Sequence, residues 1–192
     1  KVRASISPVA ALAPDGTLTA SKLVEDTTAS ADHSLRGQIV AGVVGATYLQ
    51  SVYLKAGERT SVQFYVVGGP GIFLVNLLNG VVTVIGGAPV VNTVDAGSGW
   101  WKISYTQVAN NAAPVFIYFG LVNQSLIYTG DGVSGVYMWH PSVTLVADSA
   151  LPYQRVTTAT DYDEEGFPAR WKVKTDDWAK SSISPVGANR AF

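Results

Sequence analysis

The chain of 192 residues contains no cysteine. Neither a disulfide framework nor a thiolate metal site is therefore available, so packing alone must stabilise the fold. Charged residues are also scarce, at 14% of the chain, and the formal net charge is -1. This balance lacks the basic excess that phosphate neutralisation requires, which argues against a nucleic-acid partner. A surface with so few charged side chains is typical of a protein that neighbouring subunits partly cover, or whose surface is rich in Ser, Thr, Asn and Gly.

Long apolar runs are missing as well. No run approaches the roughly 20 apolar residues of a membrane-spanning helix, and the N-terminus lacks the layout of a signal peptide, so we expect no membrane insertion. The length suffices for one domain with or without an extension. Because the chain begins at Lys1 rather than at Met, we expect a fragment, a processed product or part of a longer protein.

Alternation of apolar and polar residues predicts β-strands nearly throughout the chain. Turn signals rich in Gly, Asn, Asp and Pro separate the alternating runs at short intervals. Residues 74–78 and 81–85 flank Asn79-Gly80 and predict a hairpin with a type I′ turn. About eight to ten short strands with this spacing indicate an all-β sandwich or jelly roll. The residues that we expect to face its core are Val52, Leu54, Val62, Phe64, Val66, Trp101, Ile103 and Tyr105.

Catalytic and metal-binding patterns are weak. Asp32, His33 and Ser34 have the residue types of a catalytic triad, but neighbours on a strand point to opposite faces and cannot form the chain of contacts. We therefore predict that the chain is not an enzyme. His33 and His140 are the only histidines, and a lone, partly buried histidine is a better interpretation of each than a zinc site. The acidic residues of segment 161–165 could hold calcium but lack the ligand spacing of an EF-hand, so we expect no cofactor.

Aromatic residues on the outward faces of the strands are the remaining candidates for binding. Rings interleaved with polar groups suit sugars, because a pyranose stacks on a ring while its hydroxyl groups form hydrogen bonds. The alternative is that these rings pack under loops or at a subunit contact. The predicted glycan-binding residues are Trp100, Tyr53, Tyr65, Lys102 and Tyr118, and Tyr137 and Trp139 could extend their surface.

Four segments carry a likeness to a known domain. Residues 128–156 contain a Gly-Asp-Gly turn, an aromatic pair and a Pro-Tyr exit, formed by Gly130, Asp131, Gly132, Tyr137, Trp139, Pro152 and Tyr153. Residues 13–35 match the opening of the same domain, and residues 48–66 and 99–108 match its middle strands. Together these segments resemble the jelly-roll domain, similar to carbohydrate-binding modules, of bacteriophage tail fibres, head spikes and gene-transfer-agent particles.

The resemblance implies a virion protein with other virion proteins as partners. It divides the chain into an N-terminal arm at 1–12, a jelly roll at 13–156 and a C-terminal extension at 157–192. Trp171 and Trp178 in the extension could anchor it on its own domain or dock it on a neighbouring subunit, and both tryptophans argue against the third alternative, a disordered tail. We expect a homo-oligomer. In the Gly-Asp-Gly turn we expect a positive φ at Gly130 or Gly132 and a capping role for Asp131.

Two functions from different classes follow from these observations. The first is a non-enzymatic virion protein, a spike, fibre or decoration subunit that attaches the particle to host cell-surface polysaccharide. The second is a carbohydrate-binding module of a polysaccharide-active enzyme. The exit segment 151–155 resembles virion proteins more closely than enzyme-appended modules, which favours the first. A purely structural decoration or joining protein remains a further alternative.

Overall fold

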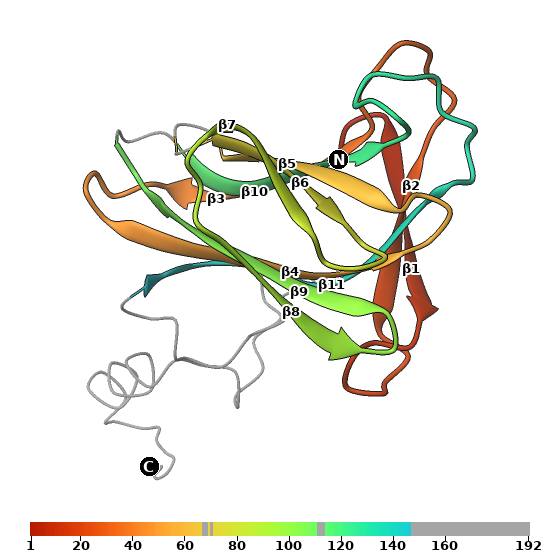
Figure 1. Ribbon diagram of the computed structural model, residues 1–192, viewed down its shortest axis with the longest axis horizontal. Helices are drawn as coiled ribbons and strands as arrows, with labels where there is room; N and C mark the ends of the chain where they lie inside the picture. Colours follow the sequence, from red (N-terminus) through yellow and green to blue (C-terminus); the bar gives the residue numbers. More distant parts are fainter. Residues whose placement is uncertain (67–68, 70, 111–113, 147–192) are drawn as a thin grey trace, which may run out of the picture. The chain divides into compact units, whose positions relative to one another are not determined.

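Two antiparallel β-sheets form the protein in the computed structural model, which describes residues 1–66, 69, 71–110 and 114–146 (Figure 1). The six-stranded sheet contains, in spatial order, β1 (Ala4–Ala11), β2 (Ala20–Glu25), β11 (Gly135–Leu145), β4 (Thr47–Ala56), β9 (Trp100–Val108) and β8 (Val91–Gly97). The five-stranded sheet contains β3 (Ser34–Ala41), β10 (Pro114–Val122), β5 (Ser61–Val66), β6 (Gly71–Asn76) and β7 (Val82–Gly87). These sheets confirm the predicted all-β sandwich.

The chain passes repeatedly from one sheet to the other, as in a jelly roll. It changes sheet between β2 and β3, β3 and β4, β4 and β5, β7 and β8, β9 and β10, and β10 and β11. Only β5, β6 and β7, and the pairs β1–β2 and β8–β9, are consecutive neighbours within one sheet. The described residues include no helix that could span a bilayer.

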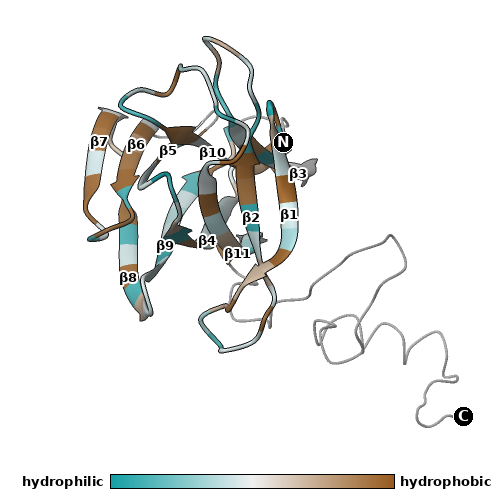
Figure 2. Ribbon diagram, turned by 90° about the vertical axis from the view of Figure 1, so that its right-hand side faces the viewer, coloured by the Kyte–Doolittle hydropathy of each residue, from teal (hydrophilic) through white to brown (hydrophobic). Residues whose placement is uncertain are grey.

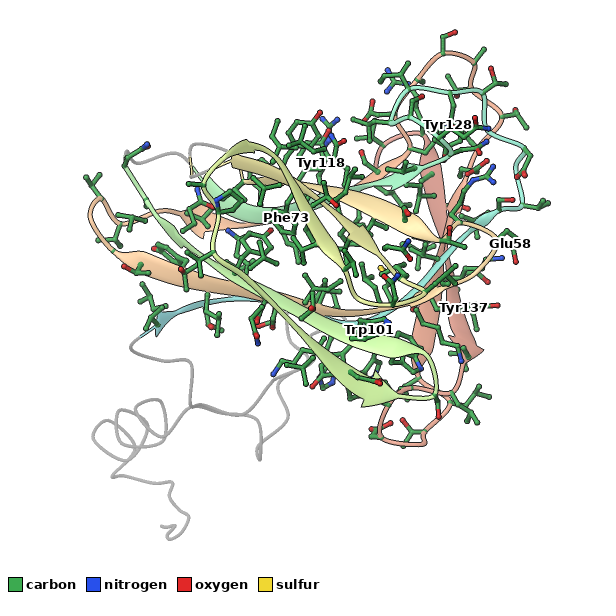
Figure 3. The ribbon with its side chains drawn as sticks, in the orientation of Figure 1. Glu58, Phe73, Trp101, Tyr118, Tyr128 and Tyr137 are labelled. Carbon is green, nitrogen blue, oxygen red and sulfur yellow. The ribbon has the colours of Figure 1, made fainter. Side chains whose placement is uncertain are left out.

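The core lies between the two sheets and is centred on aromatic rings. Phe64 stacks on Phe73 with 4.9 Å between ring centroids, and Tyr105 and Phe119 approach it at 5.7 and 5.4 Å. Figure 3 shows Phe73 between the sheets. The predicted core residues are buried as expected, except that Trp101 is only partly buried at the margin of the core. Alternation along the strands was sufficient to find them because one face of each strand meets the other sheet.

The N-terminal segment belongs to the sandwich. Within the predicted arm at 1–12, β1 pairs with β2. Val2 also exchanges main-chain hydrogen bonds of 2.8 and 2.9 Å with Ser34, which connects the six-stranded sheet to β3. Residues Lys1–Val146 form one compact unit. The predicted boundary at 156 and 157 lies outside the described residues.

The hairpin around Asn79-Gly80 is confirmed, since β6 and β7 are antiparallel neighbours. The predicted type I′ turn is wrong, because that turn needs a positive φ at both central residues and only Gly80 has one, at 71°. A longer loop forms instead, with a hydrogen bond of 2.8 Å from the Gly80 main-chain nitrogen to the Asn76 oxygen. A Cβ atom at position 80 would collide with the ring of Trp101, so the ring that covers this loop also requires glycine.

Candidate functional site

The five predicted glycan-binding residues lie on two different sheets. Tyr53 is on β4 and Trp100 and Lys102 are on β9, all in the six-stranded sheet, whereas Tyr65 on β5 and Tyr118 on β10 belong to the five-stranded sheet. The outer faces of a sandwich point in opposite directions, so these residues do not form one surface. Alternation shows which residues face away from the core but not which sheet their strand joins.

Trp100 corrects the prediction further, because it is only 1% exposed. Its side chain lies on the outer side of the sheet, where Ala13 and Ala20 pack against it. The ring nitrogen Nε1 donates a hydrogen bond of 3.1 Å to the main-chain oxygen of Leu12. The connection between β1 and β2 therefore covers Trp100, and its ring is not available to stack on a sugar.

Tyr53, Trp139 and His140 form a partly exposed group of rings on the outer side of the six-stranded sheet, here called the aromatic cluster. Trp139 and His140 stack with centroids 3.6 Å apart and planes 9° from parallel. Tyr53 meets Trp139 edge to face at 5.2 Å and His140 at 6.5 Å. Three rings from two adjacent strands thus make one continuous aromatic surface.

His140 belongs to this cluster because of an irregularity in β11. Neighbouring residues of a regular strand point to opposite faces, so Trp139 and His140 should not stack. The pairing of β11 with β4 shifts between Trp139 and Ser142, and His140 has a φ of 49°. This bulge turns the imidazole towards the indole. Sequence reasoning missed His140 as a surface residue. Pro141 could have indicated the bulge, because proline inside a strand marks a bulge or an edge.

A short polar chain holds the cluster in place. The Trp139 Nε1 donates a hydrogen bond of 3.0 Å to the Thr19 hydroxyl. The Thr19 hydroxyl lies 2.7 Å from the Thr17 hydroxyl, which donates to Asp15 Oδ1 at 2.7 Å. Partial burial lowers the pKa of His140, although Asp15 opposes this effect. Partial burial therefore favours the neutral form of the imidazole.

Cationic side chains flank the aromatic cluster. The Lys102 ammonium group lies 5.6 Å from the centre of the Tyr53 ring. Lys22 lies equally far from the Tyr137 ring but is also paired with Glu58 at 2.6 Å. Within the described part of the chain, no carboxylate forms an ion pair with Lys102 or with Lys55, which lies two residues after Tyr53 on β4. This face therefore has two positive charges without a described acidic partner.

The outer face of the five-stranded sheet has a second group of rings, with less free ring surface. Tyr118 stacks on Tyr65 with centroids 4.8 Å apart, and the Arg36 guanidinium lies 4.4 Å from the Tyr118 ring centre. Arg36 also pairs with Asp32 at 2.8 Å and donates to the Tyr118 hydroxyl at 2.9 Å. Figure 3 shows Tyr118 on the outer side of this sheet. With a neighbour on each side, Tyr118 has little free face for a sugar.

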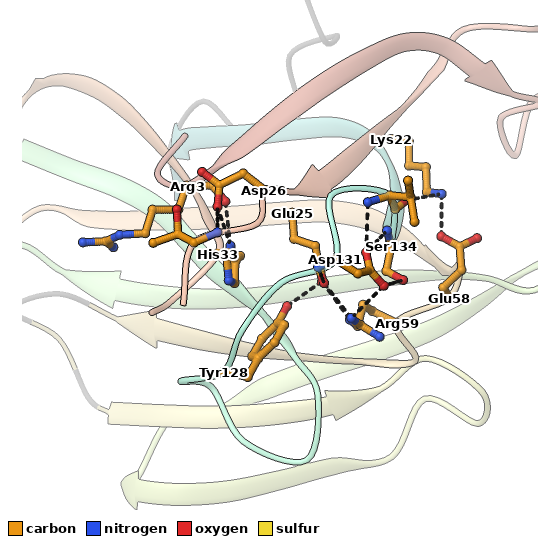
Figure 4. A network of polar contacts seen from close by, with 12 residues as sticks. Arg3, Lys22, Glu25, Asp26, His33, Glu58, Arg59, Tyr128, Asp131 and Ser134 are labelled. Atoms are coloured by element: carbon orange, nitrogen blue, oxygen red, sulfur yellow. Dashed lines mark hydrogen bonds and ion pairs between the residues drawn. The ribbon is translucent and has the colours of Figure 1, made fainter. Parts of the chain in front are cut away.

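The Gly-Asp-Gly turn has the predicted geometry, with a positive φ and a capping carboxylate (Figure 4). Gly132 has a φ of 81°, and Asp131 Oδ1 accepts hydrogen bonds from the main-chain nitrogens of Val133 and Ser134 at 2.9 and 2.7 Å. The Ser134 hydroxyl donates to Asp131 Oδ2 at 2.6 Å. These donors hold the pKa of the Asp131 carboxyl well below its usual value.

The turn contacts a buried ion pair, Glu25 with Arg59, that sequence reasoning missed. Glu25 is 1% exposed and accepts two hydrogen bonds from Arg59, of 2.7 and 2.6 Å. Its carboxylate also accepts from the Tyr128 hydroxyl at 2.7 Å and from the Asp131 main-chain nitrogen at 2.9 Å. Glu25 raises the pKa of Arg59, and burial raises that of Tyr128. Four donors satisfy the carboxylate, so nothing marks it as a reacting group.

The segment Asp32-His33-Ser34 does not form a triad, as predicted. The Ser34 hydroxyl donates to Asp32 Oδ2 at 3.0 Å, but His33 is fully buried on the other side, with Nδ1 2.7 Å from the main-chain oxygen of Arg3. Among the described residues, no group of three or more His, Cys, Asp or Glu side chains could hold a metal ion. The proposed anchors Trp171 and Trp178 and the acidic segment 161–165 lie outside the described residues.

No family model matches the sequence, and no curated protein matches it either. The function must therefore be argued from the geometry of the sandwich and from the motifs of the sequence.

Proposed function

We propose that this chain is a non-enzymatic virion protein of a bacteriophage or a gene transfer agent, and that it attaches the particle to polysaccharide on the host cell surface. The observation that carries the binding proposal is the aromatic cluster of Tyr53, Trp139 and His140 beside Lys102. The virion part rests on the resemblance of residues 13–156 to phage fibre and spike domains.

The aromatic cluster has the properties that sugar stacking requires. Its rings are partly exposed and contact one another, so a pyranose that stacks on one ring also lies beside its neighbours. Trp139 is already held by Thr19 and by the stacked His140, so little side-chain entropy is lost when a ligand binds. Such a preformed surface favours a polysaccharide whose repeating sugar units each bind with low affinity.

The charges on this face favour an acidic polysaccharide. Lys55 and Lys102 have no described carboxylate partner, so carboxylate or phosphate groups on the ligand would supply the missing negative charge. Attraction between exposed charges weakens with salt. Binding to an acidic polysaccharide should accordingly be stronger than binding to the same polymer after reduction of its carboxyl groups, and should fall as salt is added.

Titration of the purified chain against immobilised acidic and carboxyl-reduced polysaccharides tests the proposal. Tyr53→Ala should weaken binding about 2- to 10-fold, the effect of about 0.5 to 1.5 kcal/mol for one ring. Tyr65→Ala, on the opposite sheet, is the matched control and should bind as the wild type does. Lys102→Gln should reduce binding to the acidic polymer and leave binding to the reduced polymer unchanged.

Three outcomes would count against the proposal. If Tyr53→Ala and Tyr65→Ala bound equally well, the six-stranded sheet would not be the binding face. If the wild type bound neither polymer even when several copies were displayed on one surface, where avidity adds roughly 10² to 10⁴, glycan binding would be rejected. If purified particles that adsorb to host cells lacked the chain, the virion assignment would be wrong.

A further inference from the structure

One side of the sandwich has no charged side chains and exposes several large apolar ones. Residues 60–94 contain no Asp, Glu, Lys, Arg or His, and they include β5, β6, β7 and most of β8. Strands β7 and β8 are the last strands of the five- and six-stranded sheets. Figure 2 shows β7 as a largely hydrophobic strand at the border of its sheet. The exposed large apolar residues of this side are Leu78, Val81, Val84, Ile85, Val90 and Val94.

The opposite side of the sandwich is built differently. There Val2, just before the edge strand β1, forms one main-chain bridge with Ser34 at the start of the edge strand β3. Asp32 also binds Arg3 and Arg36 at 2.8 Å each, which places charges beside this edge. Backbone pairing and charge are two usual ways in which proteins protect a sheet edge. Neither protects β7, which pairs only with β6 among the described residues.

The chemistry of β7 indicates what can cover it. An edge strand presents free N–H and C=O groups, which a second extended strand can pair. A charged strand would lose hydration here without gaining an ionic partner, because residues 60–94 supply none. The β7 strand of a second copy meets these requirements, because it is neutral, extended and apolar. An antiparallel pairing of two identical strands also closes the contact about a twofold axis.

We propose that two copies of this chain associate through antiparallel pairing of their β7 strands. The two five-stranded sheets then continue into each other across the twofold axis. Val84 and Ile85, at 48% and 53% exposed, become covered at the centre of the contact. Because the two outer faces of each sandwich are not used, the aromatic cluster stays accessible in the dimer.

Sedimentation or light scattering of the full chain tests this pairing. The wild type should be a dimer at micromolar concentration. Ile85→Lys and Ile85→Glu each place like charges near the twofold axis and should weaken the dimer at least roughly tenfold. An equimolar mixture of the two variants should restore a dimer, since the charges then attract. Val133→Lys is the matched control, because Val133 is 67% exposed in the Asp131 turn and should leave the dimer intact.

Hydrogen exchange of the wild type provides a second test that needs no variant. The amides of β7 should become protected as concentration rises, while the exposed loop at 15–19 should not change. A wild type that stays monomeric, or charge variants that stay dimeric, would overturn the proposal. A mixture of variants that fails to associate would exclude the twofold pairing. A monomer with β7 protected at every concentration would show that another segment of the same chain covers this strand.

Discussion

Arg59 binds Glu25 through two parallel hydrogen bonds, Nε to Oε2 at 2.7 Å and Nη2 to Oε1 at 2.6 Å. Glu25 ends β2, whereas Arg59 precedes β5 and the Asp131 turn precedes β11. The pair therefore fastens the six-stranded sheet to a strand of the five-stranded sheet and to the Gly-Asp-Gly turn. The stability of the fold should therefore depend on the presence of both Arg59 and Glu25.

Arg59→Ala should lower the free energy of unfolding by about 3 to 5 kcal/mol, because it leaves a buried carboxylate without its cation. Urea denaturation followed by tryptophan fluorescence measures the loss. Lys22→Ala breaks the more exposed pair with Glu58 and is the control, with an expected cost of about 1 kcal/mol or less. The double change Glu25→Gln with Arg59→Met should recover part of the loss. Equal effects of Arg59→Ala and Lys22→Ala would contradict this view of the buried pair.

Trp100→Ala should destabilise the fold by about 3 to 5 kcal/mol, since it removes a buried indole under the β1–β2 connection. Trp100→Phe keeps most of the ring and loses the hydrogen bond to Leu12, so it should cost much less. Thermal unfolding of both variants checks this order. A Trp100→Ala variant with an unchanged Tm would mean that the ring is not buried.

The Asp131 carboxyl should make the fold sensitive to acid. Hydrogen bonds from Ser134 and Val133 hold its folded pKa below the usual value of 3.8, so folding favours the ionised form. The stability that it contributes is complete above about pH 4 and is lost as pH falls towards the folded pKa. Asp131→Asn retains an acceptor for the two main-chain nitrogens and should cost about 1 kcal/mol at pH 7.

Urea denaturation at pH 7 and pH 3 measures this acid dependence. The difference between the two pH values should be smaller in Asp131→Asn than in the wild type. Ser134→Ala keeps the carboxylate but removes the Ser134 hydroxyl donor, so its difference should be intermediate. An Asp131→Asn variant with the full wild-type difference would assign the acid sensitivity to other carboxylates.

Gly130→Ala should destabilise the protein by about 1 to 3 kcal/mol, the usual cost of inserting atoms into a packed site. Its Cβ would collide with the main-chain oxygen of Asp26 and approach the His33 ring at 2.9 Å. Gly37→Ala is the matched control, because its Cβ would meet only Ile117 at an ordinary 3.5 Å. If the two variants melted at the same temperature, the packing around His33 would be looser than the structure indicates.

The amino-acid sequence was sufficient to predict the local features of this protein. Alternation identified the all-β class and core residues such as Phe64 and Ile103, because one face of a strand is buried wherever two sheets pack. The Asn-Gly signal identified a hairpin, and the Gly-Asp-Gly triplet identified a capped turn at Asp131. Each of these features depends on residues that are near one another in the chain.

Which of the outward residues form a common surface depends on the tertiary structure. Tyr53 and Tyr65 have the same pattern of neighbours, yet their strands join different sheets. Trp100 faces away from the core as predicted, but a distant connection covers it, and a bulge brings His140 onto Trp139. Glu25 and Arg59 meet across 34 residues of sequence. Strand order, loop coverage and long-range ion pairs depend on contacts between distant segments, and periodicity along a single strand carries no information about them.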